Sequence, residues 1–236
     1  MISRRQTFKN MVGFAALTGA IATEVQAQDS CAVFTSTTQA AVTPDAALKR
    51  LQEGNARFVA GKTVNCDLTK QVKETATQQS PIAVIVGCID SRVPPEMVFD
   101  QRLGDVFAAR IAGNFVNTDI IGSLEFATAA AGAKLIVVLG HSECGAIKGA
   151  VDDVKLGNLT SMLANIRPSL TKLNYVGVPS SKNKELVQKV ADQNAKDAAD
   201  MIMAKSTVIA DLVKSGKVKI VSAMHDLSTG KISFFA

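Results

Sequence analysis

Two short apolar segments, each followed directly by metal-binding side chains, place the strongest constraint on how this chain can fold. Residues 82–87 (IAVIVG) and 134–140 (KLIVVLG) are rich in β-branched residues, a composition that predicts buried strands. Cys88 follows the first segment, and His141 and Cys144 follow the second. Open α/β sheets bind ligands outside the carboxyl ends of their strands. The sequence therefore predicts that these three side chains meet at one edge of a sheet.

Helical and strand patterns alternate along the rest of the chain and predict an α/β fold. The 236 residues, 47% of them hydrophobic, suit one globular domain with a substantial core. Further strands are expected at 105–110, 217–224 and 231–235, and helices at 44–61, 69–78, 117–132, 144–155, 159–173 and 182–214. The alternation predicts a mostly parallel β-sheet flanked by helices. The turn at Thr229 and Gly230 adds an antiparallel C-terminal edge strand.

Charge and aromatic content argue against a nucleic-acid partner. The formal net charge is +5, but beyond the N-terminus the basic residues are scattered rather than gathered in one stripe. The chain has no Trp and one Tyr, so it offers few aromatic platforms on which bases could stack. We therefore expect no nucleic acid among its partners.

The spacing of the cysteines and histidine predicts a zinc site. His141 and Cys144 place two candidate ligands on one turn, and Cys88 can approach from the neighbouring strand. Two thiolates and one imidazole suit Zn²⁺, and three protein ligands leave a fourth position for water, as in catalytic zinc sites. The alternative is a buried strand-end thiol beside a structural histidine. Because both clusters follow equivalent strands, we expect one Zn²⁺ per chain.

The two motifs together resemble those of the β-class carbonic anhydrases. The CIDSR segment at 88–92 is followed by GHSECGA at 140–146, and ARIAGN at 109–114 matches as well. The resemblance extends from about Pro44 to the C-terminus. It implies zinc-dependent, reversible hydration of carbon dioxide to bicarbonate and a proton by attack of zinc-bound hydroxide. It also implies a homodimer or a higher even oligomer.

The resemblance assigns catalytic roles to Asp90 and Arg92. Arg92 would keep Asp90 ionised through a bidentate pair, and Asp90 would accept a hydrogen bond from the zinc-bound hydroxide and aim it at the substrate. Away from a metal ligand, the same pair would be an ordinary salt bridge in a turn. The family also has a closed form, in which the equivalent of Asp90 is itself a fourth metal ligand. The pocket residues favour the plant-like branch, in which that position is open.

The resemblance also implies a substrate pocket made of Gln79, Phe107, Ala112 and Phe126. Gln79 would hydrogen-bond a substrate oxygen, and the other three would line an apolar pocket for carbon dioxide, across a dimer interface. Without the family match, the phenylalanines would be core residues and Gln79 a surface residue.

Two other functions fit the same fold. Hydrolysis of carbonyl sulfide or carbon disulfide would depend on residues at the entrance of the site, which the sequence does not identify. A non-catalytic module that binds zinc or bicarbonate would be indicated by the loss of Asp90 or Arg92, and both are present.

The N-terminal residues have the pattern of an export signal. Arg4 and Arg5 match the twin arginines of the Tat route, and an apolar stretch at 11–22 leads to a plausible cleavage site at 25–27 (VQA). The apolar stretch is shorter than the roughly 20 residues that span a bilayer, so no stable membrane anchor is expected. An uncleaved anchor or an amphipathic helix is the alternative.

These patterns predict three regions and a periplasmic location. A Tat-type signal peptide is expected over 1–27 and a flexible arm over 28–43. The carbonic anhydrase-like domain is expected over 44–236.

Three further features have two interpretations each. In an oxidising periplasm Cys31 and Cys66 could pair, or both could be free thiols. The amphipathic segment 44–61 could pack on a partner subunit, as the resemblance implies, or on its own sheet. His225 could shuttle protons, because an ordinary histidine titrates near neutral pH, or it could be a partly exposed structural residue.

Overall fold

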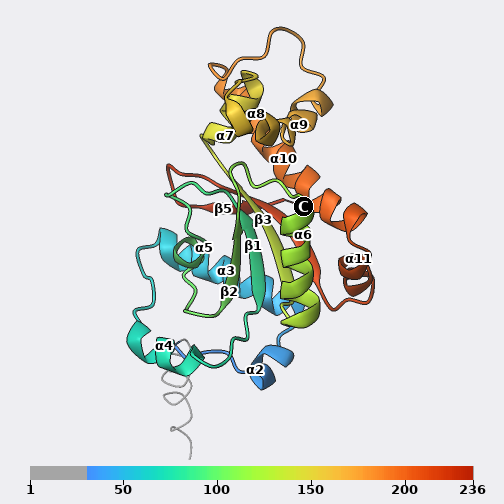
Figure 1. Cartoon of the computed structure of the whole chain (residues 1–236). Coiled ribbons are helices and arrows are strands. Elements are labelled where there is room, and N and C mark those ends of the chain that lie inside the picture. Colours follow the sequence, from blue (N-terminus) through green and yellow to red (C-terminus); the bar gives the residue numbers. More distant parts are fainter. Residues whose placement is uncertain (1–30, 236) are drawn as a thin grey trace, which may run out of the picture. The chain divides into compact units, whose positions relative to one another are not determined.

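The computed structural model describes residues 31–235, of which residues 33–235 belong to one compact unit. Its centre is a β-sheet (Figure 1), in which the strand order is β2-β1-β3-β4-β5. The strands are β1 (Ala83–Gly87), β2 (Val106–Arg110), β3 (Leu135–His141), β4 (Lys219–His225) and β5 (Ile232–Phe234). Neighbouring strands run parallel except β4 and β5, which are antiparallel. The predicted α/β sheet with an antiparallel C-terminal edge strand is confirmed.

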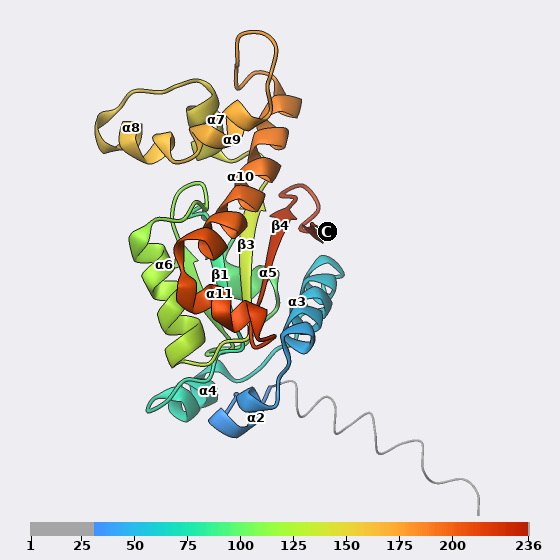
Figure 2. The same ribbon diagram turned by 90° about the vertical axis from the view of Figure 1, so that its right-hand side faces the viewer.

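Strands β1 and β3 are buried on both faces because helices cover each side of the sheet. Alternate residues of a strand point to opposite faces. Val84 and Val86 of β1 pack toward α6 (Thr118–Glu125), α10 (Lys184–Lys205) and α11 (Thr207–Lys214) (Figure 2). Residues of the opposite face pack toward α3 (Pro44–Val59) and α5 (Pro95–Val98). Continuous β-branched runs of this kind are what a doubly covered parallel sheet requires.

Helix α3 follows the sequence signals at both ends. The Thr43 side chain accepts a hydrogen bond from the Ala46 N–H, and Pro44 occupies the first helical position. Gly61, with φ of +64°, lies just beyond the end of the helix. The fully buried Leu51 of α3 packs in the same hydrophobic cluster as Ile85 of β1. The buried stripe of α3 therefore covers the sheet of its own chain.

Three helical segments are divided differently from the expectation. The run expected over 182–214 is broken at Ser206, whose extended backbone ends α10 and whose hydroxyl caps α11 by accepting from the Ile209 N–H. The segment 117–132 ends in a single π-helical stretch, η1 (Phe126–Ala130). The segment 159–173 forms α8 (Gly157–Ala164) and α9 (Arg167–Lys172), with Pro168 in the first turn of α9.

Part of the segment expected as a flexible arm is helical. Helix α2 (Ser36–Ala40) carries the buried Gln39, whose amide donates to the carbonyls of Pro81 (2.6 Å) and Ala131 (2.8 Å). These two hydrogen bonds fix the segment, so the expectation is corrected for these residues. The expected signal over 1–27 lies outside the described residues.

The remaining helices are α4 (Leu68–Thr75) and α7 (Gly145–Val151). Cys31 and Cys66 are disulfide-bonded, whereas Cys88 and Cys144 are free. None of the helices within residues 31–235 has both the length and the apolar character of a membrane span.

Candidate metal centre

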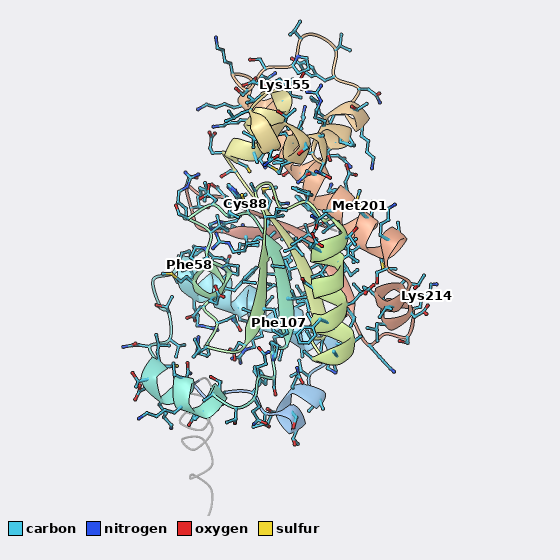
Figure 3. The ribbon with its side chains drawn as sticks, in the orientation of Figure 1. Phe58, Cys88, Phe107, Lys155, Met201 and Lys214 are labelled. Atoms are coloured by element: carbon cyan, nitrogen blue, oxygen red, sulfur yellow. The ribbon has the colours of Figure 1, made fainter. Side chains whose placement is uncertain are left out.

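Cys88, His141 and Cys144 meet at the carboxyl ends of β1 and β3, as the sequence predicts. Their ligand atoms all lie within 4.8 Å of one another, and all three side chains are buried. The strands are parallel neighbours with Gly87 beside Leu139, so the residues that follow them emerge together. Cys144 directly precedes helix α7. Figure 3 shows Cys88 at this end of the sheet.

The hydrogen bonding of His141 leaves one ring nitrogen ready to bind a cation. Its Nδ1 lies 2.9 Å from the Ser142 carbonyl oxygen, which can only accept, so Nδ1 carries the proton and Nε2 the lone pair. Nε2 is buried and has no hydrogen-bond partner among the described residues. An unpartnered buried acceptor is unfavourable. Together with two sulfur atoms, it forms a donor set that fits Zn²⁺.

The two cysteines interact with each other and with the backbone. The hydrogen bond from the Cys144 thiol lowers the pKa of Cys88, and the same interaction, together with burial, raises the pKa of Cys144. The Gly113 N–H donates to the Cys88 sulfur at 3.3 Å. One thiolate is thus favoured by the protein itself, and a bound cation would stabilise the second.

Asp90 and Arg92 form the expected bidentate pair beside the cluster. Arg92 Nε donates to Asp90 Oδ1 (3.0 Å) and Arg92 Nη2 to Asp90 Oδ2 (2.8 Å), and the Arg92 N–H adds a third bond of 3.0 Å. These bonds hold the pKa of Asp90 well below its usual range. Asp90 Oδ2 lies 3.9 Å from His141 Nε2. An ionised acceptor is therefore held next to the three candidate ligands.

The backbone of the Cys88–Asp90 loop is fixed by Arg110, at the end of β2. Arg110 Nε donates to the Cys88 carbonyl (2.8 Å) and Nη2 to the Asp90 carbonyl (2.6 Å). Two charged hydrogen bonds from one planar group restrict the loop. Arg110 lies in the ARIAGN segment at 109–114, but no role was predicted for it.

The expected substrate residues do not all lie near the centre within one chain. Ala112 lies near the centre, because its neighbour Gly113 contacts Cys88. Phe107 pairs with Val84, four residues before Cys88, which at ~3.3 Å per strand residue is about 13 Å away. Figure 3 shows Phe107 and Cys88 toward opposite ends of the sheet. Gln79 is exposed and precedes β1.

Phe126 is the remaining residue expected in the pocket, and it lies beside Phe107. It is 56% exposed, and its ring centroid is 6.1 Å from that of Phe107. Gln79, Phe107 and Phe126 therefore lie toward the opposite end of the sheet from Cys88 and leave apolar surface uncovered. The same chain does not bring them to its own metal centre.

His225 is buried rather than partly exposed, which corrects that expectation. It lies beside His141 in the ladder of β3 and β4, is 3% exposed, and neither ring nitrogen has a hydrogen-bond partner among the described residues. Burial, and next the neighbouring His141, lower its pKa. Its position results from the length of β4, which extends one residue beyond the expected end at Met224.

Proteins of similar sequence are carbonic anhydrases. A family model described as "Carbonic anhydrase" matches residues 83–232. The carbonic anhydrase of Mycolicibacterium smegmatis is 34% identical over 195 residues, covering 80% of this chain and 92% of that protein. Carbonic anhydrase 2 of Mycobacterium tuberculosis is 34% identical over 194 residues, covering 80% and 91%.

Solved structures agree in fold. One of two tetrameric β-carbonic anhydrases from Sordaria macrospora matches with a TM-score of 0.61 and 25% identity, covering 71% of this chain and 90% of that chain. A Coccomyxa β-carbonic anhydrase in complex with acetazolamide has a TM-score of 0.62 at 22% identity, covering 80% and 86%, and supports the fold alone. From its sequence, its sheet and its cysteine–histidine cluster, the chain belongs to the β class of the carbonic anhydrase family.

Proposed function

We propose that this protein catalyses the reversible hydration of carbon dioxide to bicarbonate and a proton at the Cys88–His141–Cys144 centre. Membership of the carbonic anhydrase family supports the reaction. The location of the active centre is supported by one observation: three buried ligand atoms converge within 4.8 Å, beside a carboxylate that an arginine holds in place.

Cys88, His141 and Cys144 would hold one Zn²⁺ per chain. When bound, zinc supplies a water ligand whose pKa is lowered toward neutrality. The chain contributes two sulfurs and the His141 Nε2 lone pair, which the Ser142 carbonyl keeps pointing inward by accepting from Nδ1. This partner fixes both the tautomer and the ring orientation before any ion binds.

Asp90 would orient the attacking water and Arg92 would keep Asp90 in place. The lowered pKa of Asp90 keeps it ionised at neutral pH, so it can accept a hydrogen bond but cannot donate one. Both of its oxygens are bonded to Arg92. This pairing supports the open form, in which Asp90 is not a metal ligand and the fourth position belongs to water.

We further propose that two copies assemble to complete the substrate pocket. Gln79, Phe107 and Phe126 lie away from the centre of their own chain, and β2, which carries Phe107, is an outer strand of the sheet. A second copy seated on this edge would cover Phe126 and place apolar side chains at a neighbouring centre. The protein would then be a homodimer or a higher even oligomer.

The expected export signal leads to a proposed periplasmic location. The support is the pair Arg4 and Arg5, followed by an apolar stretch and the VQA segment at 25–27. Changing both arginines to lysine keeps the charge and should leave the precursor in the cytoplasm. Fractionation with N-terminal sequencing of the exported wild type, expected to begin near Gln28, tests this; a full-length wild-type chain in the cytoplasm contradicts it.

The function is tested by stopped-flow carbon dioxide hydration with parallel zinc analysis. The wild type should hydrate carbon dioxide and carry about one zinc per chain. Cys88→Ser and His141→Ala should lose zinc and activity together. His225→Gln changes the other histidine and should keep the metal. Full zinc occupancy in Cys88→Ser or His141→Ala would refute the ligand assignment.

A further inference from the structure

Asn194, on helix α10, is a polar residue within an otherwise apolar buried stripe. The neighbours on the stripe are Val190, Ala191, Ala195 and Ala198, and Asn194 itself is 2% exposed. Burying an amide is unfavourable unless it is hydrogen-bonded. We therefore expect Asn194 to make a hydrogen bond that an apolar side chain at this position could not make.

The partner of Asn194 is the backbone next to the metal centre. Asn194 Nδ2 donates to the Gly113 carbonyl oxygen at 2.8 Å, a buried hydrogen bond that joins residues 81 positions apart. The N–H of the same glycine donates to the Cys88 sulfur at 3.3 Å. Gly113 thus links the amide of α10 to a candidate zinc ligand.

Gly113 can transmit the position of Asn194 because its backbone is confined. Its φ is +82°, in the region that favours glycine, and a Cβ added there would lie 2.5 Å from Ile166 Cδ1 and 3.2 Å from Ala146 Cβ. The residue has close neighbours on one side and two hydrogen bonds on its own backbone. A change at its carbonyl would therefore also move its N–H.

We propose that Asn194 is a positioning residue for zinc, which acts through Gly113 on the Cys88 sulfur. The N–H···S bond draws electron density from the sulfur and sets the direction from which Cys88 approaches the metal. Partners of this kind orient metal ligands, and their loss commonly reduces metal affinity by about 10- to 100-fold. This inference rests on the proposed zinc centre but concerns a residue that touches neither metal nor substrate.

Asn194→Ala tests the proposal against a matched control, Asn55→Ala. Asn55 is also buried, and its Nδ2 donates to two backbone carbonyls, those of Val98 and Gly230, at 2.9 Å each. Both variants lose a buried amide, so both should be less stable. Only Asn194→Ala should bind zinc more weakly, by 10- to 100-fold in competition with a chelator.

Cobalt substitution supplies a readout that a general loss of stability would not change. Weakening the N–H···S bond raises the energy of the sulfur lone pair, so the thiolate-to-cobalt charge-transfer band of Asn194→Ala should shift to longer wavelength. The band of Asn55→Ala should match that of the wild type. If Asn194→Ala does not fold, Asn194→Ser, whose hydroxyl is one bond shorter than the amide arm, should show the same shift.

The outcomes separate this proposal from the zinc assignment itself. A wild type that binds no zinc would overturn both. A wild type that binds zinc, with an Asn194 variant whose zinc affinity and cobalt spectrum are unchanged, would overturn the role of Asn194 alone. Equal losses of affinity in the Asn194 and Asn55 variants would also overturn it, because the effect would then follow from stability.

Discussion

At the scale of single residues, the proposed activity of the centre depends on the Asp90–Arg92 pair. Asp90 is held by three hydrogen bonds from one residue, so its direction is fixed, and a candidate metal ligand, Cys88, lies two positions away. A carboxylate in this place can orient water without occupying the metal. Catalysis depends strongly on such orientation.

Replacing Asp90 by Asn should separate zinc binding from activity. The amide keeps the size of the side chain but replaces one accepting oxygen by a donor, so the water would lose its orientation. We expect full zinc content and a fall in kcat/KM on the order of 10²-fold in stopped-flow hydration. Asp152→Asn, at an exposed carboxylate bonded to Ser181, is the control and should be unchanged. Wild-type hydration by Asp90→Asn would contradict the assigned role.

At the scale of elements, α9 and α10 are joined by a partly buried carboxylate. Asp197 of α10 accepts from Ser169 Oγ and Lys172 Nζ, both at 2.6 Å, and from Gln193 Nε2 at 2.9 Å. Burial raises the pKa of Asp197, but these three hydrogen bonds outweigh it and hold the pKa below its usual value. The ionised form therefore stabilises the contact between the two helices.

The pH dependence of stability should reveal this contact. A lowered pKa in the folded state gives stability that is present above the unfolded value of about 3.9 and is lost as pH falls through the folded value. Asp197→Asn should be about 1.5–3 kcal/mol less stable at pH 7, with a smaller difference in acid. Denaturant unfolding at several pH values measures this. Asp211→Asn, at an exposed carboxylate, should change little, and a pH-independent difference for Asp197→Asn would contradict the account.

The sequence predicted those elements whose causes are local. The β-branched runs gave β1 and β3, and Thr43 with Pro44 gave the start of α3. The break at Ser206 was not predicted, because its extended backbone is stabilised by contacts from elsewhere, including its hydrogen bond to Glu125.

The convergence of the site residues Cys88, His141 and Cys144 was predictable, because equivalent strand ends must converge. The role of Asn194 was not predicted, because its partner Gly113 is distant in sequence. The feature that could have indicated it is a polar residue in an apolar helical stripe.

At the scale of the whole molecule, one chain leaves its expected pocket incomplete. Phe126 is 56% exposed beside Phe107, and both lie far along the sheet from Cys88. Phe126 is exposed and Phe107 is partly buried, and an exposed apolar patch commonly marks an interface. The proposed assembly of two copies would bury them.

A charge at Phe126 should weaken this assembly. Phe126→Glu would place a carboxylate in an apolar interface, where burial without a partner is costly. We expect size-exclusion chromatography with light scattering to show the wild type at twice the mass of one chain or more, and the variant shifted toward the monomer with reduced activity. Val176→Glu, on a loop residue that is 93% exposed, is the control. A wild type that is active as a monomer would contradict the proposed assembly.

Carbon dioxide hydration by this protein should depend on zinc held by Cys88, His141 and Cys144. This dependence is tested most directly by removing the metal and titrating zinc back while hydration is followed by stopped flow. We expect the metal-free protein to be inactive and activity to rise in proportion to bound zinc, reaching its limit at about one ion per chain. Undiminished hydration by the metal-free protein, or zinc binding that restores no activity, would contradict it.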